Sequence, residues 1–138
     1  MAQTNFEKLR VYQLAEQLAD LIWQIVNKWE YFPKHTVGKQ MVTAADGVGS
    51  NIAEGSGRGS YQDNRRFVKI ARGSLYETKN WLRRSFRRQL ISDEDVKKLK
   101  PIMDQLLPSL NAYYRSIDKA AQNERTKYKA QNTKHKKQ

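Results

Sequence analysis

A dense group of Lys and Arg side chains between residues 65 and 88 is the strongest chemical signal in the sequence. At about 100° per helical residue, one set of positions falls within roughly 40° of a common line: Arg65, Lys69, Arg72, Tyr76, Lys79, Arg83 and Arg87. Three further cations sit beside this line, at Arg66, Arg84 and Arg88. Like charges three or four residues apart repel by a few tenths of a kcal/mol each, and an external polyanion offsets that cost. We therefore predict that these nine cations contact the phosphate backbone of RNA or DNA, with little direct reading of base sequence.

Two other interpretations of these cations stay open at this stage. They are also what the solvated face of a surface helix presents, and an acidic protein partner would satisfy them equally well. Tyr61 and Tyr76 are candidates for stacking on bases, whereas Trp81 is more typical of a core residue.

Residue types that catalyse reactions or bind metals are present, but without a recognisable pattern. His35 and His135 are far apart, and the acids from Asp93 to Asp95 are explained as a helix cap. The serines lack a neighbouring His, and the run from Gly55 to Ser60 lacks the Lys-Ser/Thr of a phosphate-binding loop. We expect no catalytic residue, no metal site, no cofactor and no enzymatic activity.

Length and composition point to a small basic protein. The chain has 138 residues, 26 Lys and Arg against 14 Asp and Glu, a net charge of +12 and no Cys. The charge is uneven: residues 1–57 carry −1, residues 58–100 carry +8 and residues 101–138 carry +5. No apolar run approaches the ~18 residues of a membrane span, so we expect a cytoplasmic protein without a membrane partner.

Hydrophobic spacing predicts four helices. Apolar residues recur at three- and four-residue steps over about 5–30, 35–54, 61–90 and from residue 92 onward. Phe32-Pro33 is expected to end the first helix, Gly55 to cap the second in a left-handed conformation, and Pro108 to kink the fourth. Ser92 and Asp95 form a capping-box pattern at the start of the fourth.

This pattern predicts an all-α protein, an up-down-up-down antiparallel four-helix bundle with a basic C-terminal tail. We expect the bundle to occupy residues 1–120. Residues 121–138 lack an apolar stripe and are expected to be a basic polar tail, mobile or a frayed extension of the helix.

A short motif at the end of the second predicted helix is more specific than charge. The segment Asn51-Ile-Ala-Glu-Gly55, followed by Gly57-Arg58, resembles the signature of the bacterial four-helix-bundle family named for proteins encoded in 23S rRNA intervening sequences. Further matches extend the resemblance over about residues 5–118: Phe6, Leu9, Phe32-Pro33, Gly38, Gln40, Arg66-Phe67, Gly73-Ser74-Leu75 and Glu77. The sequence departs from the family pattern at residues 37–41, where a Gly-Leu pair is usual, and in the tail.

The resemblance implies a four-helix protomer that assembles into a homopentamer with a central channel. It also implies a relation to the accessory variability protein of diversity-generating retroelements, which associates with a reverse transcriptase and nucleic acid. A second functional hypothesis therefore stands beside nucleic-acid binding: an accessory or adaptor protein that docks a reverse transcriptase or another nucleic-acid enzyme.

The motif itself has a structural explanation. A carboxylate near the C-terminal end of a helix is disfavoured by the helix dipole, so Glu54 needs a partner. Arg58 is the nearest candidate, and the third predicted helix offers three others, at Arg65, Arg66 and Arg72. We expect Asn51, Glu54, Gly55, Gly57 and Arg58 to form a buried polar network that stabilises the turn.

Overall fold

Helices make up nearly all of the described chain. The computed structural model describes residues 5–136, which contain helices and short connections but no strand. The elements are η1 (Phe6–Lys8), α1 (Arg10–Asn27), α2 (Tyr31–Pro33), the π-helical turn η2 (Lys34–Gly38), α3 (Lys39–Ser56), α4 (Tyr61–Arg87) and α5 (Asp93–Lys136). The prediction of an all-α protein with four main helices is confirmed. Residues 1–4 of the predicted bundle and 137–138 of the predicted tail lie outside the described residues.

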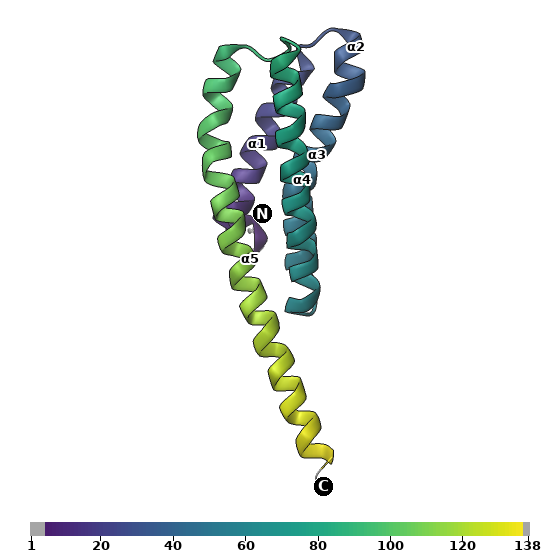
Figure 1. The fold of residues 1–138 in the computed structure, drawn as a ribbon, viewed down its shortest axis with the longest axis vertical. Helices are drawn as coiled ribbons and strands as arrows, with labels where there is room; N and C mark the ends of the chain where they lie inside the picture. Colours follow the sequence, from purple (N-terminus) through teal and green to yellow (C-terminus); the bar gives the residue numbers. More distant parts are fainter. Residues whose placement is uncertain (1–4, 137–138) are drawn as a thin grey trace.

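The four long helices lie side by side around one core. In Figure 1, consecutive helices are joined alternately at the top and the bottom of the molecule. α1 packs on α3 and α5, and α4 packs on the same two helices, so each long helix has two neighbours. None of the helices within residues 5–136 has both the length and the apolarity that crossing a membrane requires.

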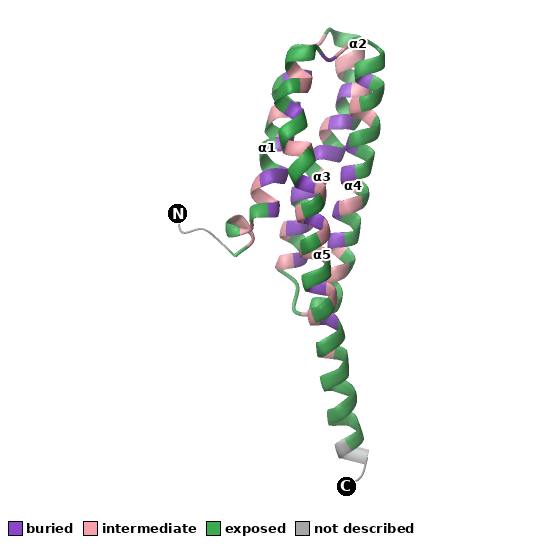
Figure 2. Ribbon diagram, turned by 60° about the vertical axis from the view of Figure 1, so that its left-hand side comes forward, coloured by how far each residue is buried: buried purple, intermediate pink, exposed green. Residues whose placement is uncertain are grey.

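The predicted apolar stripes form the core. The inward faces of the helices carry the buried residues in Figure 2. The most completely buried large side chains are Leu14, Leu18, Ile22, Met41, Val48, Ile52, Val68, Leu106 and Leu110. On α4 the buried line is Asn64, Val68, Ala71, Leu75, Thr78 and Ser85, and this leaves the long cationic residues outward.

The end of the first helix differs from the prediction. α1 ends at Asn27, and an extended Glu30 precedes a new helix that begins at Tyr31 and continues through η2 into α3. Pro33 therefore lies in the first turn of a helix, where its missing N–H costs no hydrogen bond. The prediction that Phe32-Pro33 ends the first helix was wrong for this reason.

Gly55 is not a left-handed cap. No glycine among residues 5–136 has a positive φ, and α3 continues through Gly55 to Ser56. A Cβ at Gly55 would lie 2.5 Å from Asn64 Oδ1 and 2.9 Å from Phe67 Cβ on α4. Glycine is needed here because α3 and α4 approach closely, and the backbone conformation imposes no such need.

The left-handed cap lies instead at the end of α4. Gln89 has φ 60°, and the N–H of Leu90 donates to the carbonyl of Ser85 at 2.9 Å. This closes α4 in the manner of a Schellman motif with a residue other than Gly. The predicted capping box of α5 is confirmed: Asp95 N–H donates to Ser92 Oγ at 3.1 Å, and Ser92 N–H donates to Asp95 Oδ2 at 3.2 Å.

α5 continues well beyond the predicted end of the bundle. It runs through Pro101 and Pro108 without ending and remains helical to Lys136. Ala121 is still buried, and the backbone N–H of Tyr61 donates to Glu124 Oε2 at 3.2 Å. Past this contact the side chains of residues 125–133 are exposed, and the helix projects alone below the other three (Figures 1 and 2).

Candidate nucleic-acid interface

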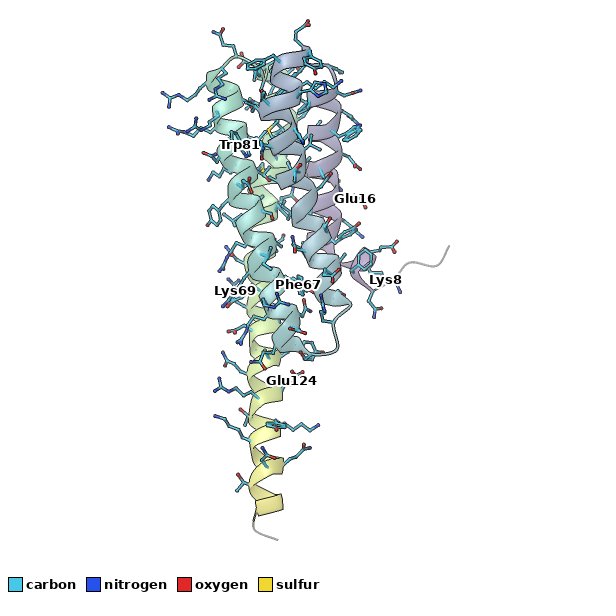
Figure 3. The ribbon with its side chains drawn as sticks, turned by 90° about the vertical axis from the view of Figure 1, so that its right-hand side faces the viewer. Lys8, Glu16, Phe67, Lys69, Trp81 and Glu124 are labelled. Atoms are coloured by element: carbon cyan, nitrogen blue, oxygen red, sulfur yellow. The ribbon has the colours of Figure 1, made fainter. Side chains whose placement is uncertain are left out.

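Six of the nine predicted cations form a row along the edge of α4 that faces α5. This basic row consists of Arg65, Lys69, Arg72, Lys79, Arg83 and Arg87. Contacts with α5 place it: Arg65 bonds to Asp118, whereas Lys69 and Arg72 lie over the ring of Tyr114. In Figure 3 the labelled Lys69 extends away from the bundle, on the side opposite Glu16 of α1.

The other three predicted cations lie on a different side of α4. Arg66, Arg84 and Arg88 are displaced from the basic row by about 100–140° around the helix axis. Arg66 is 4.5 Å from the ring centre of Phe67 and 3.8 Å from Asp63, so its contacts lie within the first turns of α4. All three side chains are exposed, and they widen the positive surface without extending the row.

Arg65 is a structural cation rather than a free one. Its Nη1 lies 2.7 Å from Asp118 Oδ1, and both side chains keep less than a third of their exposure, 26% and 29%. This ion pair joins the first turns of α4 to the middle of α5. Lys69 and Arg72 are partly engaged as well, with the Tyr114 ring centre at 5.9 Å and 4.9 Å.

The free positive charge is concentrated in the later turns of α4. In the described part of the chain, no carboxylate forms an ion pair with Lys79, Arg83, Arg84, Arg87 or Arg88. All five side chains are exposed. Five cations within ten residues, none of them in an ion pair among the described residues, produce a local positive field that attracts anions.

A cleft runs between α4 and α5 beside these cations. Its volume is about 410 Å³, and its floor is apolar, built from Leu82, Phe86, Ile91, Val96, Leu99 and Met103. Lys79, Arg83 and Lys100 stand at its rim. Phe86 is half exposed there.

The predicted network around Asn51 and Glu54 is present only in part. Arg58 Nη2 donates to Glu54 Oε1 at 2.8 Å, so the predicted partner of Glu54 is confirmed. These two side chains remain 40% and 55% exposed, which contradicts the expectation of a buried network. Asn51 donates to the carbonyl of Gly47 within α3, and Gly57 caps that helix through its backbone N–H.

The opposite side of the molecule carries an acidic cleft of about 360 Å³ between α1 and α3. Glu16, Asp20 and Asp46 line it together with Tyr12, whose hydroxyl donates to Glu16 Oε2 at 3.0 Å. Burial, followed by the repulsion of Asp20, raises the pKa of Asp46 above its ordinary value. Burial and the bond to Glu16 likewise raise the pKa of Tyr12.

Residues suited to catalysis or metal binding do not converge elsewhere in the part of the chain that the structure describes. No group of three or more His, Asp or Glu side chains is arranged to hold a metal ion there. His35 stacks on Tyr31 with ring centres 4.2 Å apart. The side chain of His135 lies outside the described residues.

Sequence reasoning missed the contribution of α5 to this surface. Asp118 and Tyr114 hold three members of the basic row, and both lie on the α4-facing side of α5. Their spacing of four residues indicates that Tyr114 and Asp118 lie on the same face of a helix. Nothing in the sequence indicates which basic residue of α4 each of them contacts.

Comparison with known families identifies the fold. The family model for 23S rRNA-intervening sequence proteins matches residues 7–112, which is more than half of the chain and includes α1, α3, α4 and the first half of α5. No curated protein matches the sequence. The chain therefore belongs to the 23S rRNA-intervening sequence protein family.

Proposed function

We propose that this protein is a non-enzymatic nucleic-acid-binding protein whose α4 cations contact the phosphate backbone of RNA or DNA. The observation that carries the proposal is the unpaired, exposed group from Lys79 to Arg88. A phosphate backbone supplies regularly spaced negative charges, and each neutralised phosphate releases counterions, which drives binding.

The arrangement of charge favours this function over a merely solvated surface. A solvated helix face usually mixes signs, because oppositely charged pairs four residues apart stabilise the helix. α5 follows this rule, with Lys100 and Asp104 2.8 Å apart. The later turns of α4 do not follow it, and the acids Glu16, Asp20 and Asp46 gather across the molecule.

The protein is further proposed to act in the cytoplasm as a homo-oligomer, a homopentamer in keeping with its family. Support comes from large aromatic side chains that are exposed to solvent in the single chain. Trp23, Tyr31 and Phe32 are 60%, 77% and 76% exposed. Trp23 borders a cleft of about 240 Å³ that also includes Val26 and Val42. Exposed apolar patches of this kind mark interaction surfaces. Sedimentation of the native chain and of Trp23→Glu tests this, and loss of the oligomer is expected.

A second candidate function is that of an adaptor that docks a reverse transcriptase or another nucleic-acid enzyme. The observation in its favour is the apolar cleft between α4 and α5 with cations at its rim, a chemistry suited to an acidic amphipathic helix of a protein partner. Gene neighbourhood separates the two functions, since an adjacent reverse transcriptase gene with variable repeats favours the adaptor.

The test of nucleic-acid binding is a salt titration with charge-reversal variants. Arg83→Glu combined with Arg87→Glu is expected to weaken binding of labelled RNA and DNA. It should also lower the slope of log affinity against log salt by about 1.4–1.8, since each of the two lost phosphate contacts contributes ~0.7–0.9. Far-UV circular dichroism should remain unchanged, because both side chains are exposed.

The matched control is Lys8→Glu combined with Arg10→Glu. It changes the net charge by the same amount at two exposed cations outside α4. If both double variants lose equal affinity, net charge alone governs binding and α4 is not the site. Unchanged binding in Arg83→Glu/Arg87→Glu would also refute the assignment.

A further inference from the structure

The positive surface of α4 continues onto the projecting part of α5. Two contacts fix which residues of α5 lie beside which residues of α4. Arg65 bonds to Asp118, and the backbone N–H of Tyr61, at the start of α4, donates to Glu124. Arg125 and Lys129 lie within roughly 20° of Asp118 around the axis of α5, on the side that faces α4. Both are exposed. They continue the line of the basic row past Tyr61, where α4 begins. We call the basic row together with Arg125 and Lys129 the basic track.

Exposed aromatic rings alternate with the cations of this basic track. Tyr76 is 54% exposed, with Arg72 four residues before it and Lys79 three residues after it. Tyr128 is 65% exposed and lies beside the line of Arg125 and Lys129, about 80° around the axis of α5 from Asp118. Phe86, 50% exposed, opens onto the apolar cleft beside Arg83. Each of the three rings therefore lies within one helical turn of a cation of the track.

A double helix cannot stack its bases on these rings, because the faces of the bases already stack on one another inside the duplex. A single strand offers them freely, and stacking of bases on aromatic side chains beside a basic groove is how such strands are held without sequence preference. The apolar cleft at Phe86 can shield a base from water, while Lys79 and Arg83 at its rim can contact the phosphates.

We propose that the basic track is a binding site for single-stranded polynucleotide, with bases stacked on Tyr76, Phe86 and Tyr128 and phosphates on the intervening cations. This inference rests on the proposed function and narrows its substrate class. From the helix rise, Tyr128 to Phe86 spans about 47 Å along the molecule. At about 3.4 Å per stacked nucleotide, the site accommodates roughly 14 nucleotides.

The experiment measures the affinity of the full chain for labelled oligouridine, oligothymidine and a blunt duplex, each of about 15 nucleotides or base pairs, at equal salt. Single strands are expected to bind more tightly than the duplex. Tyr76→Ser and Tyr128→Ser are each expected to weaken single-strand binding by about 5- to 150-fold and to leave duplex binding unchanged. The oligouridine and oligothymidine arms distinguish RNA from DNA.

Two controls keep the test specific to the ring. Tyr76→Phe retains the aromatic face and should bind like the native chain. Ile70→Ser removes another exposed apolar side chain of α4, about 120° around the axis from Tyr76, and should also bind like the native chain. Shortening oligouridine to about 5 nucleotides should lose affinity more steeply than shortening from about 20 to 15, where the track is already filled.

The outcomes separate the two levels of the proposal. If the duplex binds as tightly as the strands and both Tyr→Ser variants bind like the native chain, the single-strand site is refuted. In that case Arg83→Glu/Arg87→Glu would still weaken binding, and the proposed function would stand. If no polynucleotide binds the native chain, both are refuted.

Discussion

Gly55 offers the sharpest test of how this bundle is held together. A Cβ at this position would lie 2.5 Å from Asn64 Oδ1, 2.9 Å from Phe67 Cβ and 3.1 Å from the carbonyl oxygen of Asn64. Two of these atoms are fixed by the backbone of α4, so Gly55→Ala must push the two helices apart. Asn64 is also buried, and its Oδ1 accepts no hydrogen bond, so moving that oxygen breaks no bond and the contacts with the α4 backbone set the cost.

The magnitude follows from two opposing terms. Overpacking of this kind costs typically 1–3 kcal/mol, and the backbone contacts place Gly55→Ala near the upper end, at about 2–3 kcal/mol. Replacing Gly by Ala inside a helix returns about 0.5–1 kcal/mol. The net loss is therefore about 1–2.5 kcal/mol, which lowers the melting temperature by roughly 3–10 °C for a chain of this length. Gly55→Val should lose more, since it adds two methyl groups.

The assay is thermal unfolding followed by circular dichroism at equal protein concentration. Gly73 provides the matched control, because it lies inside α4 and a Cβ there would meet nothing within 4 Å. Gly73→Ala should therefore raise stability by about 0.5–1 kcal/mol. A Gly55→Ala protein that melts at or above the native temperature would refute the argument from close helix approach.

Three further perturbations test other contacts. Asp118→Asn should lower the free energy of unfolding by about 1 kcal/mol, because it breaks the partly buried ion pair with Arg65. Lys100→Ala, which removes an exposed ion pair, should change the free energy of unfolding by less than about 0.5 kcal/mol. Urea unfolding measures both values, and equal losses would contradict the reasoning. The pKa of Asp46 is raised in the folded chain, so its ionised form destabilises the fold above that pKa and the penalty disappears as pH falls through it. Asp46→Asn should then melt higher than the native chain at pH 7, with no difference below pH 3.8, and a constant difference across this range would exclude titration of Asp46 as the cause. Gln89→Gly should stabilise the protein by about 0.5–1 kcal/mol by relieving the left-handed backbone, and a loss of stability in calorimetry would show that the Gln89 side chain matters more.

The sequence predicted the elements that depend on local spacing. The stripes around Leu14, Met41 and Leu106 are buried as expected, because a helical period needs only residues within one helix. The capping box of Ser92 and Asp95 was equally local. Phe32-Pro33 misled because a proline marks the first turn of a helix as readily as the end of one.

Features that depend on two helices were beyond the sequence. Gly55 was predicted to be a left-handed cap because a glycine at a helix end is typical of such a cap. A glycine there is equally typical of a close approach by a second helix, which is what α4 makes. The candidate site shows the same limit. The outward row of cations on α4 could be predicted from the helical period of their positions. The pairing of Arg65 with Asp118 could not, because it depends on which residues of α5 lie beside which residues of α4.

The π-helical turn at Lys34–Gly38 has a consequence for how this helix tolerates change in length. A π turn winds about one residue more than an α turn, so η2 behaves as an insertion inside an otherwise regular helix. Deleting one residue from this segment would let the backbone close into ordinary α turns and keep α3 in phase with the core. The same deletion within α3 would turn Met41 or Val48 away from the interior. The joint between α2 and α3 is therefore a place where this chain can lose a residue and keep the register of α3.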